Sequence, residues 1–373
     1  MARDADVIVV GLGGMGSAAA YHLARRGRAV LGFDRFPPGH ANGSSHGRSR
    51  MIRDAVDERY APLVRRAREL WADLEQESGR SLVRTNGQLT IAAKNDASLA
   101  RFAASATKFG VPHELLSAEA VNTRFAGFAL PDELGALYEP DAGTLAPEEC
   151  VAAHAELAAK HGADLHYEEP VVTWRAEGDG VVVETETGSY PAARLVITPG
   201  PWAPELLQSL DVPFAVQRIS NVHFEPDGLD DADVAALPNF AMNVAEGDFY
   251  VLPHEPPWGV KIGLHDRRET CSADTIRRDV AQAEVDEYRN VLQRYLPGSA
   301  GTVLHTLTCM YTDTLDLHFV VDALPGAPNV FVGCGCSGHA FKETAVLGEI
   351  LADLAIDGRT KHGIDHLSAA RFA

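Results

Sequence analysis

Three glycines near the start of the chain have the spacing of a loop that binds the phosphates of a dinucleotide. Gly11, Gly13 and Gly16 follow the apolar residues 7–10 in the order G-x-G-x-x-G, and a helical pattern continues to Gly27. In such a loop the glycines allow a tight turn and a close approach to a pyrophosphate, which binds at the helix N-terminus. A second apolar run ends at Asp34, whose carboxylate can accept hydrogen bonds from a ribose. The pattern therefore predicts a dinucleotide site and leaves NAD(P) and FAD open.

Other reactive side chains gather in four short segments, residues 44–53, 250–265, 308–312 and 335–342. The first segment belongs to a loop rich in glycine, serine and histidine that carries Arg48, Arg50 and Arg53. A guanidinium can bind a carboxylate through two parallel hydrogen bonds. We therefore expect this loop to cover the phosphates of a cofactor or an anionic substrate, although a solvated basic loop has the same composition.

Composition excludes several classes of partner. Lys and Arg number 33 against 52 Asp and Glu, so the net charge is −19, which disfavours binding to nucleic acid or to an anionic membrane. There is no signal-like N-terminus and no apolar run long enough to span a bilayer. The five cysteines are an odd number, which fits a reducing cytoplasm better than a disulfide framework, and Cys334-Gly-Cys336 lacks the second pair that a zinc site needs.

Apolar periodicity indicates the elements that must position these residues. Strands are expected at residues 29–33, 87–92, 164–168, 171–176, 181–186, 194–198, 215–224, 249–253, 260–265, 302–312 and 330–333. Helices are expected at residues 58–78, 96–109, 147–161, 201–210 and 275–295, and a closing helix is expected to start near Gly338. The segments of the dinucleotide half are separated along the chain, with a mixed sheet inserted between them.

Five motifs in this order resemble the monomeric sarcosine oxidase family of FAD-dependent amine oxidases, which includes N-methyltryptophan oxidase. The resemblance covers nearly the whole chain. The motifs are Gly-Leu-Gly-Gly-Met-Gly, Gly-Ser-Ser-His-Gly-Arg-Ser-Arg-Met-Ile-Arg, Lys-Ile-Gly-Leu-His, Cys-Met-Tyr-Thr and Gly-Cys-Ser-Gly-His-Ala-Phe-Lys. It implies an α/β fold with a glutathione-reductase-like FAD-binding domain of the p-hydroxybenzoate-hydroxylase type, formed by residues 1–84, 146–212 and 310–373. An inserted mixed-sheet substrate domain would comprise residues 85–145 and 213–309.

The resemblance also implies roles for single residues. Cys309 would carry FAD covalently through the 8α-methyl group of the ring, and Lys261 would serve the reaction with O2. Arg53 and Lys342 would bind the carboxylate of the substrate, beside Tyr250 and His265, and the catalytic group would comprise Lys261, His265, Tyr250 and Arg50. The residues expected to hold FAD are Gly11, Gly13, Gly16, Asp34, Ser44, His46, Arg50, Cys309, Gly338, His339 and Lys342.

The implied reaction is oxidation of a secondary α-amino acid, N-methyl, N-alkyl or cyclic, to an imine, with O2 reduced to H2O2. A monomer is expected, with an amino acid and O2 as its partners and no metal. Ser45 stands where the family often has histidine, Arg48 where it has aspartate, and Cys336 where a bulkier apolar residue is common, so a larger amine can be expected. Three alternatives stay open: an amine dehydrogenase with another electron acceptor, an NAD(P)-dependent reductase, and a non-catalytic flavin sensor.

Overall fold

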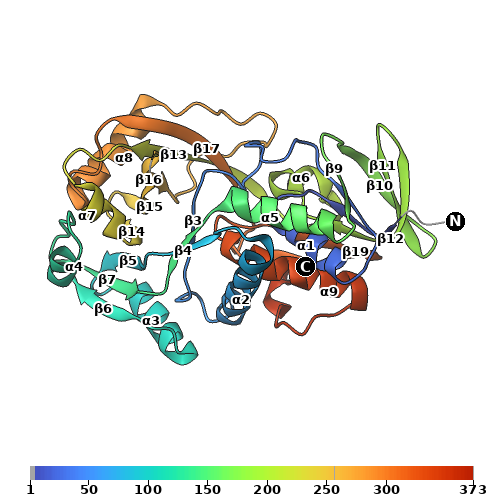
Figure 1. The fold of residues 1–373 in the computed structure, drawn as a ribbon, viewed down its shortest axis with the longest axis horizontal. Coiled ribbons are helices and arrows are strands. Elements are labelled where there is room, and N and C mark those ends of the chain that lie inside the picture. The colour runs from blue at the N-terminus through green and yellow to red at the C-terminus, as the bar shows by residue number, and fades with distance from the viewer. Residues whose placement is uncertain (1–4, 256, 373) are drawn as a thin grey trace.

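Two sheets dominate the structure, a computed structural model that describes residues 5–255 and 257–372. Within these residues the strands form two eight-stranded sheets and one three-stranded sheet. Figure 1 shows the two large sheets toward opposite ends of an elongated molecule. The three short strands that lie between them are β3 (Arg50–Ile52), β4 (Val83–Thr85) and β8 (Gly143–Leu145).

The first sheet is built around β1, which pairs in parallel with β2 and β12. Its strands are β1 (Ala5–Val10), β2 (Val30–Phe33), β9 (Asp164–His166), β10 (Val171–Glu177), β11 (Gly180–Thr185), β12 (Ser189–Ile197), β18 (Val320–Leu324) and β19 (Ala327–Cys334). Its largest core cluster lies against the helices α1 (Gly14–Arg25), α2 (Ala61–Ser78), α5 (Pro147–Lys160) and α9 (Thr344–Asp357). The parallel strands with covering helices place the loop after β1 at the carboxyl end of the sheet, where ligands bind in such folds.

The second sheet is largely antiparallel and has the strand order β17-β13-β16-β15-β14-β5-β7-β6. These strands are β5 (Gln88–Ala93), β6 (Glu114–Ser117), β7 (Leu134–Glu139), β13 (Ala215–Phe224), β14 (Asn239–Val244), β15 (Gly247–Glu255), β16 (Gly259–Leu264) and β17 (Val303–Asp313). The helices near it are α3 (Ala97–Phe109), α4 (Ala118–Arg124), α7 (Asp231–Ala236) and α8 (Gln282–Tyr295). A core of aromatic and aliphatic side chains packs one face of this sheet against α8.

Strand pairing aligns one row of residues across six strands of the second sheet. Directly paired residues in successive strands are Leu307, Asn221, Gly263, Tyr250, Ala241 and Thr90. Paired residues point to the same face of a sheet, because side chains alternate along each strand. The row therefore defines a face opposite the one that α8 covers.

Most of the expected elements are present, and three helices differ. The helix expected at residues 275–295 begins only at Gln282, and the segment 201–210 forms η1 (Gly200–Trp202), α6 (Ala203–Leu206) and η2 (Gln208–Leu210). The closing helix does not start at Gly338, because Ser337 and Gly338 have positive φ angles of 46° and 79°. It begins instead with η3 (Phe341–Glu343), which leads into α9; the remaining short helices are η4 (Asp365–Leu367) and η5 (Ala369–Phe372).

The domain boundaries stay a prediction. Strands of the first sheet come from residues 5–33, 164–197 and 320–334, and strands of the second from residues 88–139, 215–264 and 303–313. Strand β17 continues across the boundary expected between residues 309 and 310, so Cys309 lies inside a strand of the second sheet.

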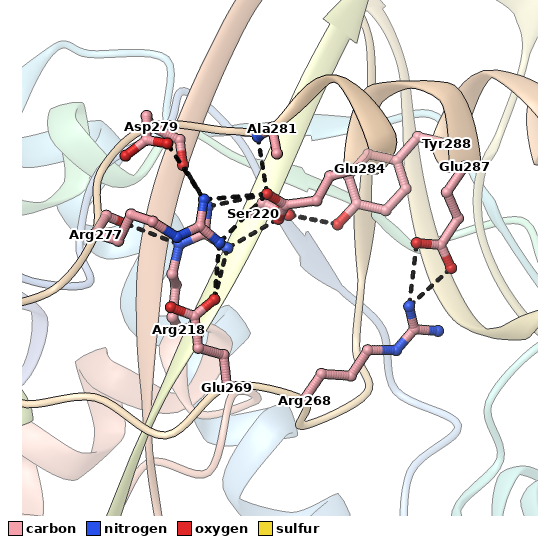
Figure 2. A network of polar contacts seen from close by, with 10 residues as sticks. All are labelled: Arg218, Ser220, Arg268, Glu269, Arg277, Asp279, Ala281, Glu284, Glu287 and Tyr288. Carbon is pink, nitrogen blue, oxygen red and sulfur yellow. Dashed lines mark hydrogen bonds and ion pairs between the residues drawn. The ribbon is translucent and has the colours of Figure 1, made fainter.

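A buried arginine explains why the segment before α8 is not helical. Arg218 on β13 has a side chain only 3% exposed, and it donates hydrogen bonds to the carbonyl oxygens of Arg277 (2.7 Å) and Asp279 (2.6 Å). It also bonds Glu284 Oε1 at 2.8 Å, in the first turn of α8 (Figure 2). Burial acts to raise the pKa of Glu284, but hydrogen bonds from Arg218 and the Ala281 backbone outweigh it and lower that pKa to about 2. The backbone before Gln282 is thus held by β13.

We predict that Arg218→Met lowers the free energy of unfolding by about 3–5 kcal/mol, because it removes the buried charged donor that ties residues 277–284 to β13. Arg268→Met is the matched control, since Arg268 is 50% exposed and pairs with Glu287 on the surface (Figure 2). In Arg268→Met the loss of unfolding free energy is expected to stay below about 1 kcal/mol. Urea denaturation near neutral pH measures both, and equal losses would contradict the anchoring role of Arg218.

Candidate active site

A single large cavity connects the glycine loop of the first sheet with the open face of the second. Its volume is about 980 Å³. The expected site residues that line it are Gly11, Gly13, Asp34, Ser44, Arg50, Arg53, Tyr250, Lys261, His265, Cys309, Gly338, His339 and Lys342. Gly16 and His46 are not in its lining. The fold thus brings together segments that are far apart in the sequence.

The end of the cavity at β1 fits the phosphates and ribose of a dinucleotide. A Cβ atom on Gly16 would lie 1.7 Å from the carbonyl oxygen of Gly11, so this turn closes only around glycine. Gly13 caps α1 without a side chain, which leaves N–H groups of the first turn available to an anion. The Asp34 carboxylate lines the cavity and accepts from the N–H of Leu12 at 2.8 Å, which fixes its orientation and leaves lone pairs for hydroxyl groups.

Arg50 joins the loop at residues 44–49 to the middle of the cavity. Its guanidinium donates to the carbonyl oxygens of Ser44 (2.9 Å) and His46 (2.6 Å). One of its nitrogens lies 3.8 Å from Cys309 Sγ, which is buried on β17. Ser44 Oγ in turn donates to the carbonyl oxygen of Met310 at 2.8 Å. A cation and a thiol are therefore held together where the loop meets the second sheet.

Lys261 is a second buried cation beside the same loop. Its Nζ donates to the carbonyl oxygens of Gly47 (2.8 Å) and Ser49 (3.2 Å). Glu148, in the first turn of α5, accepts from the N–H of Gly47 at 2.7 Å and so fixes the loop from the other side. Burial, reinforced by the charge of Arg50, lowers the pKa of Lys261 to about 7. A negative charge formed nearby would favour its protonated state.

Two more cations, Arg53 and Lys342, line the cavity from different elements. Arg53, just after β3, donates to Thr90 Oγ1 at 3.0 Å. Lys342, in the short helix before α9, donates to the carbonyl oxygen of His339 at 2.7 Å and lies 2.9 Å from Glu343 Oε1. A pair of fixed cations in a partly dry pocket is suited to a carboxylate, whose charge they compensate.

Tyr250 and His265 stand side by side on the open face of the second sheet. Tyr250 donates to Asn221 Oδ1 at 2.6 Å, and the two side chains meet above Gly263, where a Cβ would lie 2.3 Å from the phenol oxygen. His265 Nδ1 lies 3.0 Å from the hydroxyl of Tyr311. Burial, with the positive charge of Arg267, lowers the pKa of His265 to about 4, so its imidazole is neutral near pH 7.

The remaining expected residues lie around the cavity without a charge of their own. His46 is buried, and its Nε2 atom has no hydrogen-bond partner among the described residues. Burial and the Arg50 charge lower its pKa to about 4. His339 bonds the carbonyl oxygen of Leu317 at 2.9 Å, and burial lowers its pKa to about 3. Gly338 lies against the ring of Tyr311.

Sequence reasoning missed several residues that shape the cavity, and it identified Ser45 only as a departure from the family pattern. Ser45 Oγ accepts from the N–H of Gly14 at 3.1 Å, and Thr198 Oγ1 donates to the carbonyl oxygen of Gly11 at 2.7 Å. Asn221 and Asp248 line the cavity as well. Among Thr198, Asn221 and Asp248, only Asp248 carried a usable signal. It lies directly before the expected strand 249–253 and two residues before Tyr250, so it would share the face of Tyr250 if that strand began one residue earlier.

The structure holds no candidate metal cluster within the described residues. In the same residues, no helix is long and apolar enough to cross a membrane.

Known proteins match this chain over nearly its whole length. The family model for FAD dependent oxidoreductases matches residues 6–354. Monomeric sarcosine oxidase of Streptomyces avermitilis is 41% identical, over 100% of this chain and 99% of its own. N-methyl-L-tryptophan oxidase of Escherichia coli O157:H7 is 34% identical, over 98% of this chain and 99% of its own.

Solved structures give the same assignment. NikD, an amino acid oxidase essential for nikkomycin biosynthesis, superimposes with a TM-score of 0.87 at 26% identity, covering 98% of each chain. The L-proline dehydrogenase of P. horikoshii shares the fold, with a TM-score of 0.87 at 22% identity. The expected fold class is therefore confirmed. The chain belongs to the FAD-dependent oxidoreductase family and, within it, to the group of the monomeric sarcosine oxidases and N-methyl-L-tryptophan oxidases.

Proposed function

We propose that the protein is an FAD-dependent oxidase that converts a secondary α-amino acid to an imine and reduces O2 to H2O2. One observation carries this proposal: a single cavity joins a dinucleotide loop to a pocket with two fixed cations, Arg53 and Lys342. The relatives named for sarcosine and N-methyl-L-tryptophan oxidation support a secondary amine as the substrate. We further propose that the enzyme acts as a monomer in the cytoplasm, in keeping with its five free cysteines.

FAD, when bound, would accept two electrons and a proton from the amine and pass the electrons to O2. The protein would orient the substrate. Arg53 and Lys342 would bind the substrate carboxylate, so that the amine points toward Tyr250 and His265. The neutral imidazole of His265 can accept or donate a hydrogen bond at the amine without adding charge.

Lys261 and Cys309 would act on the cofactor itself. Lys261 Nζ is held by two carbonyl oxygens in a buried part of the cavity, and its protonated form would stabilise the negative charge that forms when O2 is reduced. Cys309 Sγ would hold the ring through a thioether, and the guanidinium beside it would stabilise negative charge on sulfur. The two ends of the cofactor would then be fixed by different sheets.

An amine panel read by peroxide release tests the reaction. We expect sarcosine, larger N-methyl-L-amino acids or cyclic imino acids to release H2O2 and, without oxygen, to bleach the flavin. Bleaching without peroxide would instead indicate a dehydrogenase with another electron acceptor. A lack of bleaching across the whole panel would indicate a non-catalytic flavin protein, and a colourless protein would contradict the proposal altogether.

Replacement of Lys261 separates the two halves of the reaction. Lys261→Met is expected to lower the rate constant for reoxidation by O2 by about 100-fold or more, because the compensating charge is lost. Reduction of the flavin by substrate in the absence of oxygen is expected to change far less, which provides the internal control. Stopped-flow absorbance measures both steps. Unchanged reoxidation would rule out the role assigned to Lys261.

Replacement of Cys309 tests the covalent link. Wild-type protein precipitated with acid should keep its yellow colour in the pellet, whereas Cys309→Ser should release its flavin into the supernatant. Cys271→Ser is the matched control, since Cys271 is partly exposed and does not line the cavity, and it should retain the flavin. Flavin in the pellet of Cys309→Ser would place the link at another residue.

A further inference from the structure

A carboxylate that the proposed reaction does not use lies inside the same pocket. Asp248 precedes Tyr250 by two residues on β15, so both side chains point to the open face of the second sheet. Its carbonyl oxygen accepts from the N–H of His265 at 2.6 Å, and its neighbour across the other strand is Asn243. Asp248 therefore stands next to the residues that we place around the amine.

The Asp248 carboxylate has no hydrogen bond or ion pair with any residue in the described part of the chain. Other acids near the pocket are compensated: Asp313 bonds Arg267 at 2.6 Å, and Glu343 lies 2.9 Å from Lys342. Glu139 accepts from two backbone N–H groups, at 2.9 and 2.7 Å. A partly buried charge without a partner is costly, so this carboxylate is suited to a ligand that brings the compensating group.

Burial and the charged groups around Asp248 set the protonation state of its carboxyl group. Burial and the nearby Asp266 raise the pKa of Asp248 to about 6, against the opposing charges of Arg53 and Arg267. The carboxylate is thus ionised above about pH 6. Arg267 is held by Asp313, and in the proposed reaction Arg53 would bind the substrate carboxylate. With both arginines engaged, Asp248 would remain uncompensated.

Space for a substrate side chain adjoins this carboxylate. Ala241 pairs with Tyr250 across β14 and β15, and Ala92 also lines the cavity, so small side chains stand beside Asp248 and Asn243. The polar pair, carboxylate and amide, belongs to β15 and β14, whereas Cys309 belongs to β17, and strands β13 and β16 lie between β17 and β15. A substrate anchored by its own carboxylate can therefore extend its side chain along these strands.

We propose that Asp248 makes the site selective for a secondary α-amino acid whose side chain carries a second, positively charged nitrogen. This inference rests on the proposed function, since it assumes that Arg53 and Lys342 bind the α-carboxylate. Asp248 would act in recognition, and the chemical step would not depend on it.

Isosteric substrates that differ in one charge test the proposal. Nα-methyl-L-lysine and the Nα-methyl derivative of L-2-aminoheptanoic acid have side chains of equal length, ending in ammonium and methyl groups. The Nα-methyl derivatives of L-ornithine and L-norleucine form a pair that is shorter by one carbon. At about pH 8 we expect wild-type kcat/KM to favour the charged member of at least one pair by about tenfold or more. Asp248→Asn should abolish this preference. Asp266→Asn removes the same charge from a residue outside the cavity lining, and should keep the preference within about twofold.

Binding without turnover gives an independent readout. The ligands α-methyl-L-ornithine and α-methyl-L-norleucine have side chains of equal length and no hydrogen on Cα, so they cannot be oxidised there. Their dissociation constants, from calorimetry or flavin absorbance, should show the same preference in wild type and lose it in Asp248→Asn. Below about pH 6 the preference should decline in wild type, because Asp248 becomes protonated.

The outcomes separate the two proposals. Equal use of charged and neutral members by the wild type, or an unchanged preference in Asp248→Asn, would overturn the inference and leave the oxidase proposal standing. An equal loss of kcat for both members in Asp248→Asn would also overturn it, since it would indicate a proton-transfer role. If no member is oxidised or bound while another amine of the panel, such as sarcosine, is oxidised, the inference fails alone. If the whole panel fails, the proposed function fails, and the inference fails with it.

Discussion

The alternation of side chains along paired strands is the constraint on which this site depends. Cys309 lies on β17, Lys261 on β16, and Tyr250 and Asp248 on β15, with His265 directly after β16. All line one cavity because they occupy the same face of the second sheet. The opposite face is filled by the core against α8. A shift of one residue in any of these strands would turn its functional side chain into that core. The register therefore fixes the order of the site, from the thiol on β17 to the carboxylate on β15.

Two of the positive charges in the cavity are held by the backbone, whereas Lys342 lies beside the carboxylate of Glu343. Arg50 and Lys261 both bond carbonyl oxygens of residues 44–49, although the chain as a whole carries a net charge of −19. Carbonyl dipoles hold a cation in place without neutralising it. The charge then remains available to an anion. The loop can do this because Glu148 and Ser44 fix it to α5 and β17.

Local patterns in the sequence were sufficient for much of the fold. The strand-loop-helix at residues 5–25, α3 and α5 follow from glycine spacing, capping and apolar periodicity, and resemblance to a family supplied the site residues. Long-range contacts were not predictable in this way. The helical pattern before Gln282 was overridden by Arg218, which lies more than fifty residues earlier in the sequence. Likewise, Asn221 became part of the site only because β13 pairs with β16 opposite Gly263.

Different strands of the second sheet contribute to different parts of the site, and this separation affects how the substrate specificity of such an enzyme can evolve. Strands β17 and β16 carry the residues that we assign to the cofactor, whereas β14 and β5 contribute Ala241, Ala92 and Thr90 to the lining of the cavity. Strand β15 lies between these two pairs of strands, and its Tyr250 covers Gly263 on β16 so closely that no side chain fits there. Mutations on β14 and β5 can therefore alter which amine is accepted without changing the residues that we assign to the cofactor. A lineage can explore new substrates by single substitutions, with each intermediate still an active oxidase.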